Sequence, residues 1–288
     1  MKYTTILNKL LEKNDRLIAC HQGSAGGNIS YNTYRSMLNA IRQGAHIVEF
    51  DISRSKDGIF YIFHEHEEPI RLNQQEKFRE FTSEALSHMP LLNMNMQAVD
   101  SPPTVKQFMA AMKKHPHTLL HVDHAKKWGK ELLEHFDQFE DQRESIIIKT
   151  DVEVTDYLEV LAQHDVKYMT LPKVWSETDF ETIMSYRDRI NIIGFEMIFD
   201  DPQAAYVSKE TIQTLREMGY HTMINAIVLW NDRPSLCGGF DDDISLLEDP
   251  DSGWGKLLEM GFDIIQTDWP LPLKVYLEQK GVNLVYEP

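Results

Sequence analysis

Short apolar segments rich in β-branched residues alternate with segments of helical periodicity along most of the chain. This alternation is typical of a parallel sheet whose faces are covered by helices. The expected strands cover residues 16–21, 46–51, 59–64, 118–123, 145–149, 166–170, 191–196, 221–225 and 262–266. The expected helices cover residues 33–42, 104–115, 127–139, 152–164, 177–187, 209–218, 253–260 and 271–280. The pattern predicts an α/β fold.

The third of these strands does not fit the alternation. Only residues 52–58 separate it from the second strand, and Asp57-Gly58 is a typical hairpin turn. A parallel connection needs about a dozen residues or more, so the third strand must return antiparallel, as an arm. Eight parallel strands remain, each followed by a helix, which predicts a TIM (β/α)8 barrel with its site at the carboxyl ends of the strands. An open doubly wound sheet is the alternative, although the chain lacks a GxGxxG opening.

Two segments interrupt the regular alternation. Residues 65–103 follow the arm, and we expect them to form a small insertion after the second strand. Residues 226–252 follow the seventh strand and contain the acidic run 241–243, which is typical of a solvated loop. Both segments leave the carboxyl ends of strands, so they would border the mouth of the barrel. Because no interdomain linker is recognisable, we predict a single domain over residues 1–288.

The charge balance restricts the partners of the chain. Forty-five acidic residues against twenty-nine basic ones give a net charge of −16, which argues against binding to nucleic acid or to an anionic membrane. An anionic substrate is still compatible, because a bound divalent cation reverses the local field. The two cysteines build no disulfide framework, and neither a signal-peptide core nor a stretch of about 18 apolar residues is present. We therefore expect a cytoplasmic protein without stable membrane association, and the oligomeric state remains open.

Polar residues gather at the carboxyl ends of the expected strands and of the arm. They are His21, Glu49, Asp51, His64, His121, Asp123, Lys149, Glu196 and Asn225. Residues two apart in a strand share a face, so Glu49 and Asp51 point the same way. Buried charges are costly unless they are paired or bind a metal. Convergence of Glu49, Asp51 and Asp123 at one rim therefore predicts a hard divalent cation with oxygen ligands, Mg²⁺ or Ca²⁺.

Other chemistries lack the motifs that they require. The chain has no GxSxG segment for a serine hydrolase and no Gly-Lys-Ser/Thr for a P-loop. Neither cysteine has a partner at the spacing of a zinc site. Residues 23–27 (GSAGG) are either a flexible turn or a set of backbone N–H groups that face a phosphate oxygen.

The order and spacing of several short motifs resemble the glycerophosphodiester phosphodiesterase family. These motifs are His21-Gln22-Gly23, Asn32-Thr33, residues 44–51 (GAHIVEFD), Lys56-Asp57-Gly58, His64-Glu65 and residues 261–270 (GFDIIQTDWP). The family pattern runs His-Arg-Gly, Pro-Glu-Asn-Thr, Gly-Ala-Asp-x-Ile-Glu-x-Asp-Val, Lys-Asp-Gly and His-Asp, and ends with Gly-Val-Asp-x-Ile-x-Thr-Asp-x-Pro. The resemblance spans most of the chain. It implies a TIM barrel with a small insertion, in agreement with the strand count.

The resemblance also implies roles for individual residues. His21 and His64 match the catalytic histidines, and Glu49 and Asp51 match two metal ligands. Asp123 takes the place of the carboxylate in the family's Glu-x-Lys.

The phosphate-binding positions depart from the family. Lys126 lies one residue beyond the lysine of Glu-x-Lys, and Lys149 is its rival for contact with the phosphate. Gln22 and Tyr31 stand where the family has an arginine and a glutamate, two opposite charges that we infer to pair. Gln22, Lys126 and Lys149 are thus the expected substrate-binding residues. The residues around the phosphate differ from those of the family, whereas the catalytic residues match.

The function that these observations predict is metal-dependent hydrolysis of a small glycerophosphodiester or a related phosphodiester, in lipid metabolism. Two histidines would divide the general acid and general base work, because imidazole titrates near neutral pH. One alternative is a phospholipase D-like barrel that acts as a lyase and forms a cyclic phosphate. Another is a ligand-binding homologue without catalytic activity, suggested by the altered residues at 22 and 31.

Overall fold

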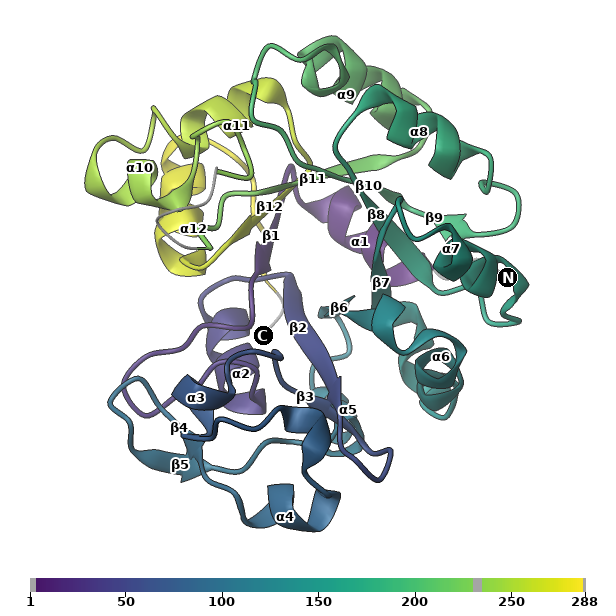
Figure 1. Cartoon of the computed structure of the whole chain (residues 1–288). Helices are drawn as coiled ribbons and strands as arrows, with labels where there is room; N and C mark the ends of the chain where they lie inside the picture. Colours follow the sequence, from purple (N-terminus) through teal and green to yellow (C-terminus); the bar gives the residue numbers. More distant parts are fainter. Residues whose placement is uncertain (1–3, 230–234, 287–288) are drawn as a thin grey trace.

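A computed structural model describes residues 4–229 and 235–286. Eight parallel strands surrounded by helices form its centre (Figure 1). They are β1 (Leu17–Cys20), β2 (Ile47–Arg54), β6 (Leu119–Asp123), β7 (Ile146–Asp151), β8 (Met169–Val174), β10 (Gly194–Met197), β11 (His221–Asn225) and β12 (Ile264–Thr267). The short β9 (Asn191–Ile192) also pairs with β8. Pairing of β1 with both β12 and β2 closes the ring, so the predicted TIM barrel is confirmed.

Helices follow the barrel strands and cover the outside of the ring. They are α2 (Tyr34–Arg42), α5 (Val105–Met112), α6 (Gly129–Asp137), α7 (Thr155–Gln163), α8 (Glu177–Met184), α9 (Lys209–Glu217), α11 (Trp254–Met260) and α12 (Pro270–Gln279). Short 3-10 turns are η2 (Ala125–Lys127), η3 (Glu140–Ser145) and η4 (Ala205–Val207). Thr33 and Thr104 begin α2 and α5 with capping boxes, in which a threonine hydroxyl accepts an N–H of the first turn.

The arm and the insertion lie where the sequence predicts them. Strand β3 (Phe60–Ile62) pairs antiparallel with the end of β2, with Ile62 opposite Ile52. The insertion then forms α3 (Glu68–Arg71), η1 (Phe78–Glu80), α4 (Ser83–His88) and a small antiparallel sheet of β4 (Leu91–Leu92) and β5 (Ala98–Asp100). A separate apolar cluster, which includes Phe63, Phe78 and Leu86, packs the insertion against the arm.

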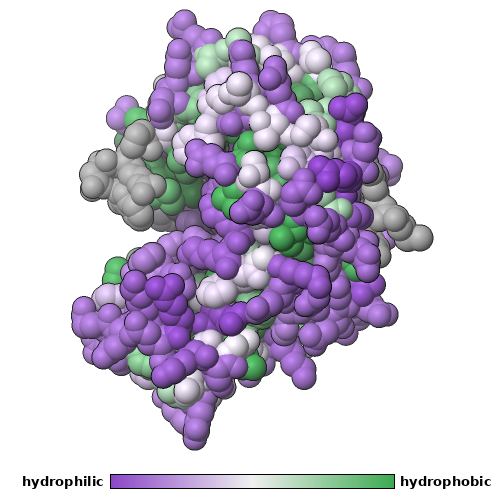
Figure 2. All heavy atoms as spheres, turned by 45° about the vertical axis from the view of Figure 1, so that its right-hand side comes forward, coloured by the Kyte–Doolittle hydropathy of each residue, from purple (hydrophilic) through white to green (hydrophobic). Residues whose placement is uncertain are grey.

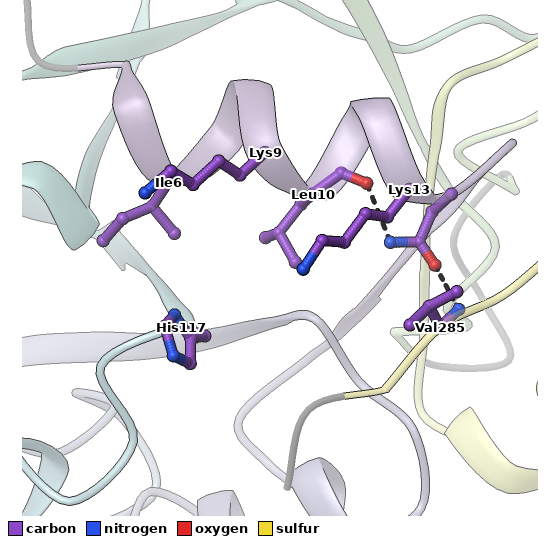
Figure 3. A pocket seen from close by; sticks show the side chains of 7 residues that line it. Ile6, Lys9, Leu10, Lys13, His117 and Val285 are labelled. Atoms are coloured by element: carbon purple, nitrogen blue, oxygen red, sulfur yellow. Dashed lines mark hydrogen bonds between the residues drawn. The ribbon is translucent and has the colours of Figure 1, made fainter.

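A helix that the sequence did not predict, α1 (Thr5–Lys13), packs against the barrel strands and is visible through the ring in Figure 1. Its Leu7 is buried in one cluster with Leu17, Ile47, Leu119 and Ile147 from the lower ends of the strands. Beside α1 lies a cavity of about 320 Å³ that reaches the C-terminal segment at Val285 (Figure 3). The Asn14 side chain donates to the carbonyl of Leu10 and accepts the N–H of Val285, which ties that segment to α1. The amino-terminal end of the barrel is therefore apolar inside and covered.

The expectation of a solvated acidic run at residues 241–243 is wrong for its first two members. Asp241 accepts the N–H of Ile244 and caps α10 (Asp242–Leu247). Asp242 is buried, and its carboxylate accepts the Trp254 indole N–H and the Thr267 hydroxyl. Burial raises the pKa of Asp242 to about 8, and these donors provide the hydrogen bonds that a buried carboxyl group needs. Separately, none of the helices in the described parts of the chain is long and apolar enough to cross a membrane.

Candidate active site

Three carboxylates meet at the carboxyl ends of neighbouring strands. Glu49 and Asp51 lie two residues apart on β2, and the register of the sheet sets Asp51 beside Asp123 of β6. Oxygen atoms of Glu49, Asp51 and Asp123 lie within 4.8 Å of one another, so the three residues form a group able to hold a metal ion. Burial and the charge of Asp51 raise the pKa of Glu49. A divalent cation would relieve this crowding of like charges.

The loop between β1 and α2 positions Asp51. The Gln22 amide donates to Asp51 Oδ2 at 2.8 Å, and the Asn32 amide donates to the same oxygen at 2.9 Å. The backbone N–H of Gln22 donates to Glu49 Oε2 at 2.9 Å. Gly23, at φ +74°, lets this loop approach α2, because a Cβ there would lie 2.7 Å from the backbone of Ser36. Gln22 therefore contacts the carboxylates of the candidate metal site.

His21 forms a pair with a carboxylate from the last strand connection. Its Nδ1 lies 2.9 Å from Asp268 Oδ1. Burial alone would lower the pKa of His21, but the Asp268 carboxylate outweighs it and raises the pKa to about 10. Asp242 in turn accepts the backbone N–H of Asp268 at 2.9 Å and so fixes this partner. Sequence reasoning did not assign Asp268 a role, although the Thr267-Asp268 motif that carries it was recognised.

A third histidine lies beside His64. The rings of His64 and His124 meet edge to face with their centroids 5.1 Å apart, and His124 Nε2 lies 3.2 Å from Asp51 Oδ1. His124 has a left-handed backbone, with φ +60°, which directs it differently from a residue that continues the strand. Asp51, His64 and His124 form a second group able to hold a metal ion. Strand periodicity gave no signal for His124.

The lysines at the rim are engaged with carboxylates. Lys149 is buried between Asp123, at 2.9 Å, and Glu196, at 3.1 Å. Burial lowers the pKa of Lys149, but these carboxylates outweigh it and raise the pKa overall. Lys126 instead contacts Asp151.

Lys173, at the end of β8, also pairs with Asp151, at 2.7 Å. Sequence reasoning missed Lys173, because the expected strand 166–170 ends too early. The structure thus joins Lys149 to the carboxylate cluster and pairs Lys126 at the adjoining strand.

The exposed surface is mainly polar on the side drawn in Figure 2, and two exposed tryptophans follow barrel strands. Figure 2 shows one side of the molecule, on which hydrophilic residues predominate and hydrophobic residues form small groups. Two aromatic side chains, Trp175 after β8 and Trp269 after β12, are each 51% exposed. Because they follow the carboxyl ends of barrel strands, they can contact the organic part of a ligand.

Solved structures of glycerophosphodiester phosphodiesterases have this architecture. A glycerophosphoryl diester phosphodiesterase from Parabacteroides distasonis covers 97% of this chain, with 94% of its own chain, 18% identity and a TM-score of 0.70. A glycerophosphodiester phosphodiesterase from Thermotoga maritima covers 91% of this chain and 98% of its own, with 16% identity and a TM-score of 0.61. The chain has the glycerophosphodiester phosphodiesterase fold.

Other comparisons add detail to this result. A phosphodiesterase from Oleispira antarctica, solved in complex with the product sn-glycerol-3-phosphate, covers 95% of this chain and 99% of its own, with 15% identity and a TM-score of 0.66. A family described as a domain of unknown function matches residues 168–277. No curated protein matches the chain in sequence. The resemblance of the motifs to glycerophosphodiester phosphodiesterases is therefore supported at the level of the fold.

Proposed function

We propose that this chain is a metal-dependent phosphoric diester hydrolase that acts on a small glycerophosphodiester or a related phosphodiester. The observation that carries the proposal is the meeting of a carboxylate cluster with two histidines at one rim of the barrel. The fold supports it, as does the sn-glycerol-3-phosphate bound to the Oleispira antarctica phosphodiesterase of the same fold.

The donor set fits a hard divalent cation. Glu49, Asp51 and Asp123 offer only oxygen atoms, which Mg²⁺ and Ca²⁺ prefer. Such an ion, when bound, would neutralise a non-bridging oxygen of the substrate and polarise the phosphorus. Gln22 and Asn32 hold Asp51 in place for this role through their amide groups.

The histidines would move the protons. The Asp268 carboxylate raises the pKa of His21 to about 10, so its imidazole is charged at neutral pH and is suited to protonate the leaving alkoxide. His64 would accept the proton of the nucleophile, either water or a hydroxyl of the substrate. Its Nδ1 is buried and has no hydrogen-bond partner among the described residues.

A screen of substrates and metals tests the proposal. Purified protein, stripped with EDTA, is incubated with glycerophosphodiesters or bis-p-nitrophenyl phosphate, with and without Mg²⁺, Ca²⁺ or Mn²⁺. We expect turnover only with metal, and phosphorus NMR to show a phosphomonoester. A cyclic phosphate would identify a lyase instead. Metal-dependent ligand binding without turnover would favour a binding protein, and full activity in metal-free protein would refute the metal assignment.

The two histidines are distinguished by leaving group. His21→Ala and His64→Ala should each lower kcat by about 10²- to 10⁴-fold on a glycerophosphodiester. On bis-p-nitrophenyl phosphate the loss at His21 should shrink, because p-nitrophenolate leaves without protonation, whereas the loss at His64 should persist. Equal losses on both substrates at both positions would contradict this division of roles.

A further inference from the structure

One arginine of the insertion packs against the loop between β1 and α2. The guanidinium of Arg71, the last residue of α3, lies 4.7 Å from the ring centroid of Tyr31 in the loop between β1 and α2. Its Nε lies 3.3 Å from Glu67 Oε2, one helical turn earlier. The Arg71 side chain is only 12% exposed. The ring and the carboxylate together hold the guanidinium in one place.

Both sides of this contact are attached to the candidate active site. Tyr31 precedes Asn32, whose amide donates to Asp51. Glu67, at the start of α3, donates its backbone N–H to the carbonyl of His64. The neighbouring Gln22, in the same loop as Tyr31, also donates its amide to Asp51. Arg71 is therefore held against the loop whose Gln22 and Asn32 position Asp51.

The positive charges elsewhere around the rim are already paired. Lys149 contacts Asp123 and Glu196, and Lys126 and Lys173 contact Asp151. Lys127 pairs with Glu65. In the described part of the chain, the hydrogen bond of the Arg71 guanidinium to a carboxylate uses Nε, and its two terminal nitrogens make none. They form a planar pair of donors that matches two oxygens of a phosphate.

We propose that Arg71 binds the non-bridging oxygens of the substrate's phosphate, and that Tyr31 positions it for this task. The assignment rests on the proposed function. It also explains how the phosphate can be bound although Gln22 replaces the family's arginine. The Gln22 amide donates to Asp51 and carries no charge. The anion contact would thus come from the insertion, after the arm, and Tyr31 would be its support.

Binding and kinetics test the proposal together. The variants are Arg71→Met, Arg71→Lys, Tyr31→Phe and Tyr31→Leu, and the control is Arg79→Met, which removes an exposed arginine of the same insertion. The dissociation constant of sn-glycerol 3-phosphate is measured by calorimetry at a fixed Mg²⁺ concentration. KM and kcat are measured on a neutral-headgroup and on a carboxylate-bearing glycerophosphodiester, and melting curves establish that each variant is folded.

The expected pattern is specific to anion binding by a stacked guanidinium. Arg71→Met should raise the dissociation constant and KM by roughly 10- to 100-fold, because a charged hydrogen bond is lost. Arg71→Lys should fall between Arg71→Met and the wild type, Tyr31→Phe should keep most of the affinity, and Tyr31→Leu should weaken it. The control should match the wild type.

Three outcomes decide the matter. If the wild type cleaves its substrate and Arg71→Met binds and reacts within twofold of it, the role of Arg71 is refuted and the proposed function stands. An effect confined to the carboxylate-bearing substrate also refutes it, because Arg71 would then read the alcohol group. The third outcome is that the wild type cleaves no substrate but binds sn-glycerol 3-phosphate, and that Arg71→Met abolishes this binding. The anion site would then be supported and the proposed hydrolase function refuted.

Discussion

The two ends of this barrel are built on the same strands but have opposite chemistry. At the amino-terminal end, Ile47, Leu119 and Ile147 pack with Leu7 of α1 in a buried apolar cluster. Four residues later on these strands stand Asp51, Asp123 and Asp151, which contact His124, Lys149 and Lys173. Side chains two apart share a face, so a step of about 13 Å along a strand leads from dry packing to charge. Stability and chemistry can therefore be varied separately.

A buried polar layer lies between the two ends. Glu49, His121, Lys149 and Glu196 are all less than 10% exposed inside the barrel, where branched apolar residues are usual. Lys149 and Glu196 pair with each other. Both ring nitrogens of His121 have no hydrogen-bond partner among the described residues, and burial lowers the pKa of His121 to about 4. The charged character of the site therefore extends into the middle of the barrel.

The largest effect on activity should come from a substitution at the carboxyl end of the barrel strands. Asp51→Ala removes the carboxylate shared by Gln22, Asn32 and His124, and we expect kcat/KM to fall by about 10³-fold or more with loss of Mg²⁺ binding. The melting temperature should change little, because the apolar end is untouched. Calorimetry with Mg²⁺ and thermal melting measure both, with the exposed Asp188→Ala as control. Metal binding equal to that of the wild type would show that the cluster is not the metal site.

The next largest effect should come from the amino-terminal end of the barrel and should change stability but not activity. Leu7→Ala leaves a cavity where α1 meets the strands, so the free energy of unfolding should fall by about 2–5 kcal/mol. Activity per folded molecule should not change. Denaturant unfolding and active-site-normalised kinetics provide the readouts, and Leu247→Ala, at a side chain 79% exposed, is the matched control. A fall in kcat at unchanged stability would mean that the two ends are coupled.

A smaller effect, on stability, should depend on pH and arise at the amino-terminal end of the barrel. His46 is buried and its Nδ1 accepts the N–H of Ile18, and burial lowers the pKa of His46 to about 4. Since the unfolded side chain titrates near 6.5, stability is complete above that pH and falls as pH drops toward 4. Between pH 7 and pH 5, His46 should therefore lower the free energy of unfolding by roughly 2 kcal/mol.

His46→Asn provides the comparison, because asparagine keeps an acceptor near the position of Nδ1 but does not titrate. Denaturant unfolding at the two pH values should show a smaller acid loss in this variant, with the remainder shared by groups such as His121. The same acid loss in both proteins would exclude His46 as the cause.

The smallest effect should be at Lys126. Its amine is paired with Asp151 and its side chain is 32% exposed, so its removal breaks a weak surface pair. Lys126→Met should therefore keep kcat/KM within about threefold of the wild type, similar to Lys127→Met. A loss above tenfold on steady-state kinetics would instead assign Lys126 to the substrate, as the sequence resemblance implies.

Local sequence patterns were sufficient to predict the barrel and the positions of Glu49 and Asp51 on it. The short turn at Asp57-Gly58 forces an antiparallel arm, and this reduces nine strands to eight in a ring. Alternation within β2 sets Glu49 and Asp51 on one face. These features depend on neighbours in sequence, so they can be read without a structure.

The remaining polar residues of the rim depend on turns and distant packing. Pro172 interrupts the apolar pattern of β8, and with it Lys173 was missed, although the strand continues to Val174. The left-handed backbone of His124 follows no strand period. Asp242 is buried where Trp254 and Thr267, 12 and 25 residues further along the chain, donate to it. The contact of Arg71 with Tyr31 likewise joins two loops that no sequence spacing relates.

The arm gives the molecule an evolutionary property. Glu49, Asp51 and Asp123 belong to strands of the ring, whereas His64 and Arg71 belong to the hairpin and to the segment that follows it. A recombination event that replaced residues 65–103 would exchange the part that we assign to ligand contact and leave the cation ligands untouched. Descendants of one ancestral barrel that differ in this segment are therefore expected to keep the same metal preference while they diverge in the phosphodiesters that they accept.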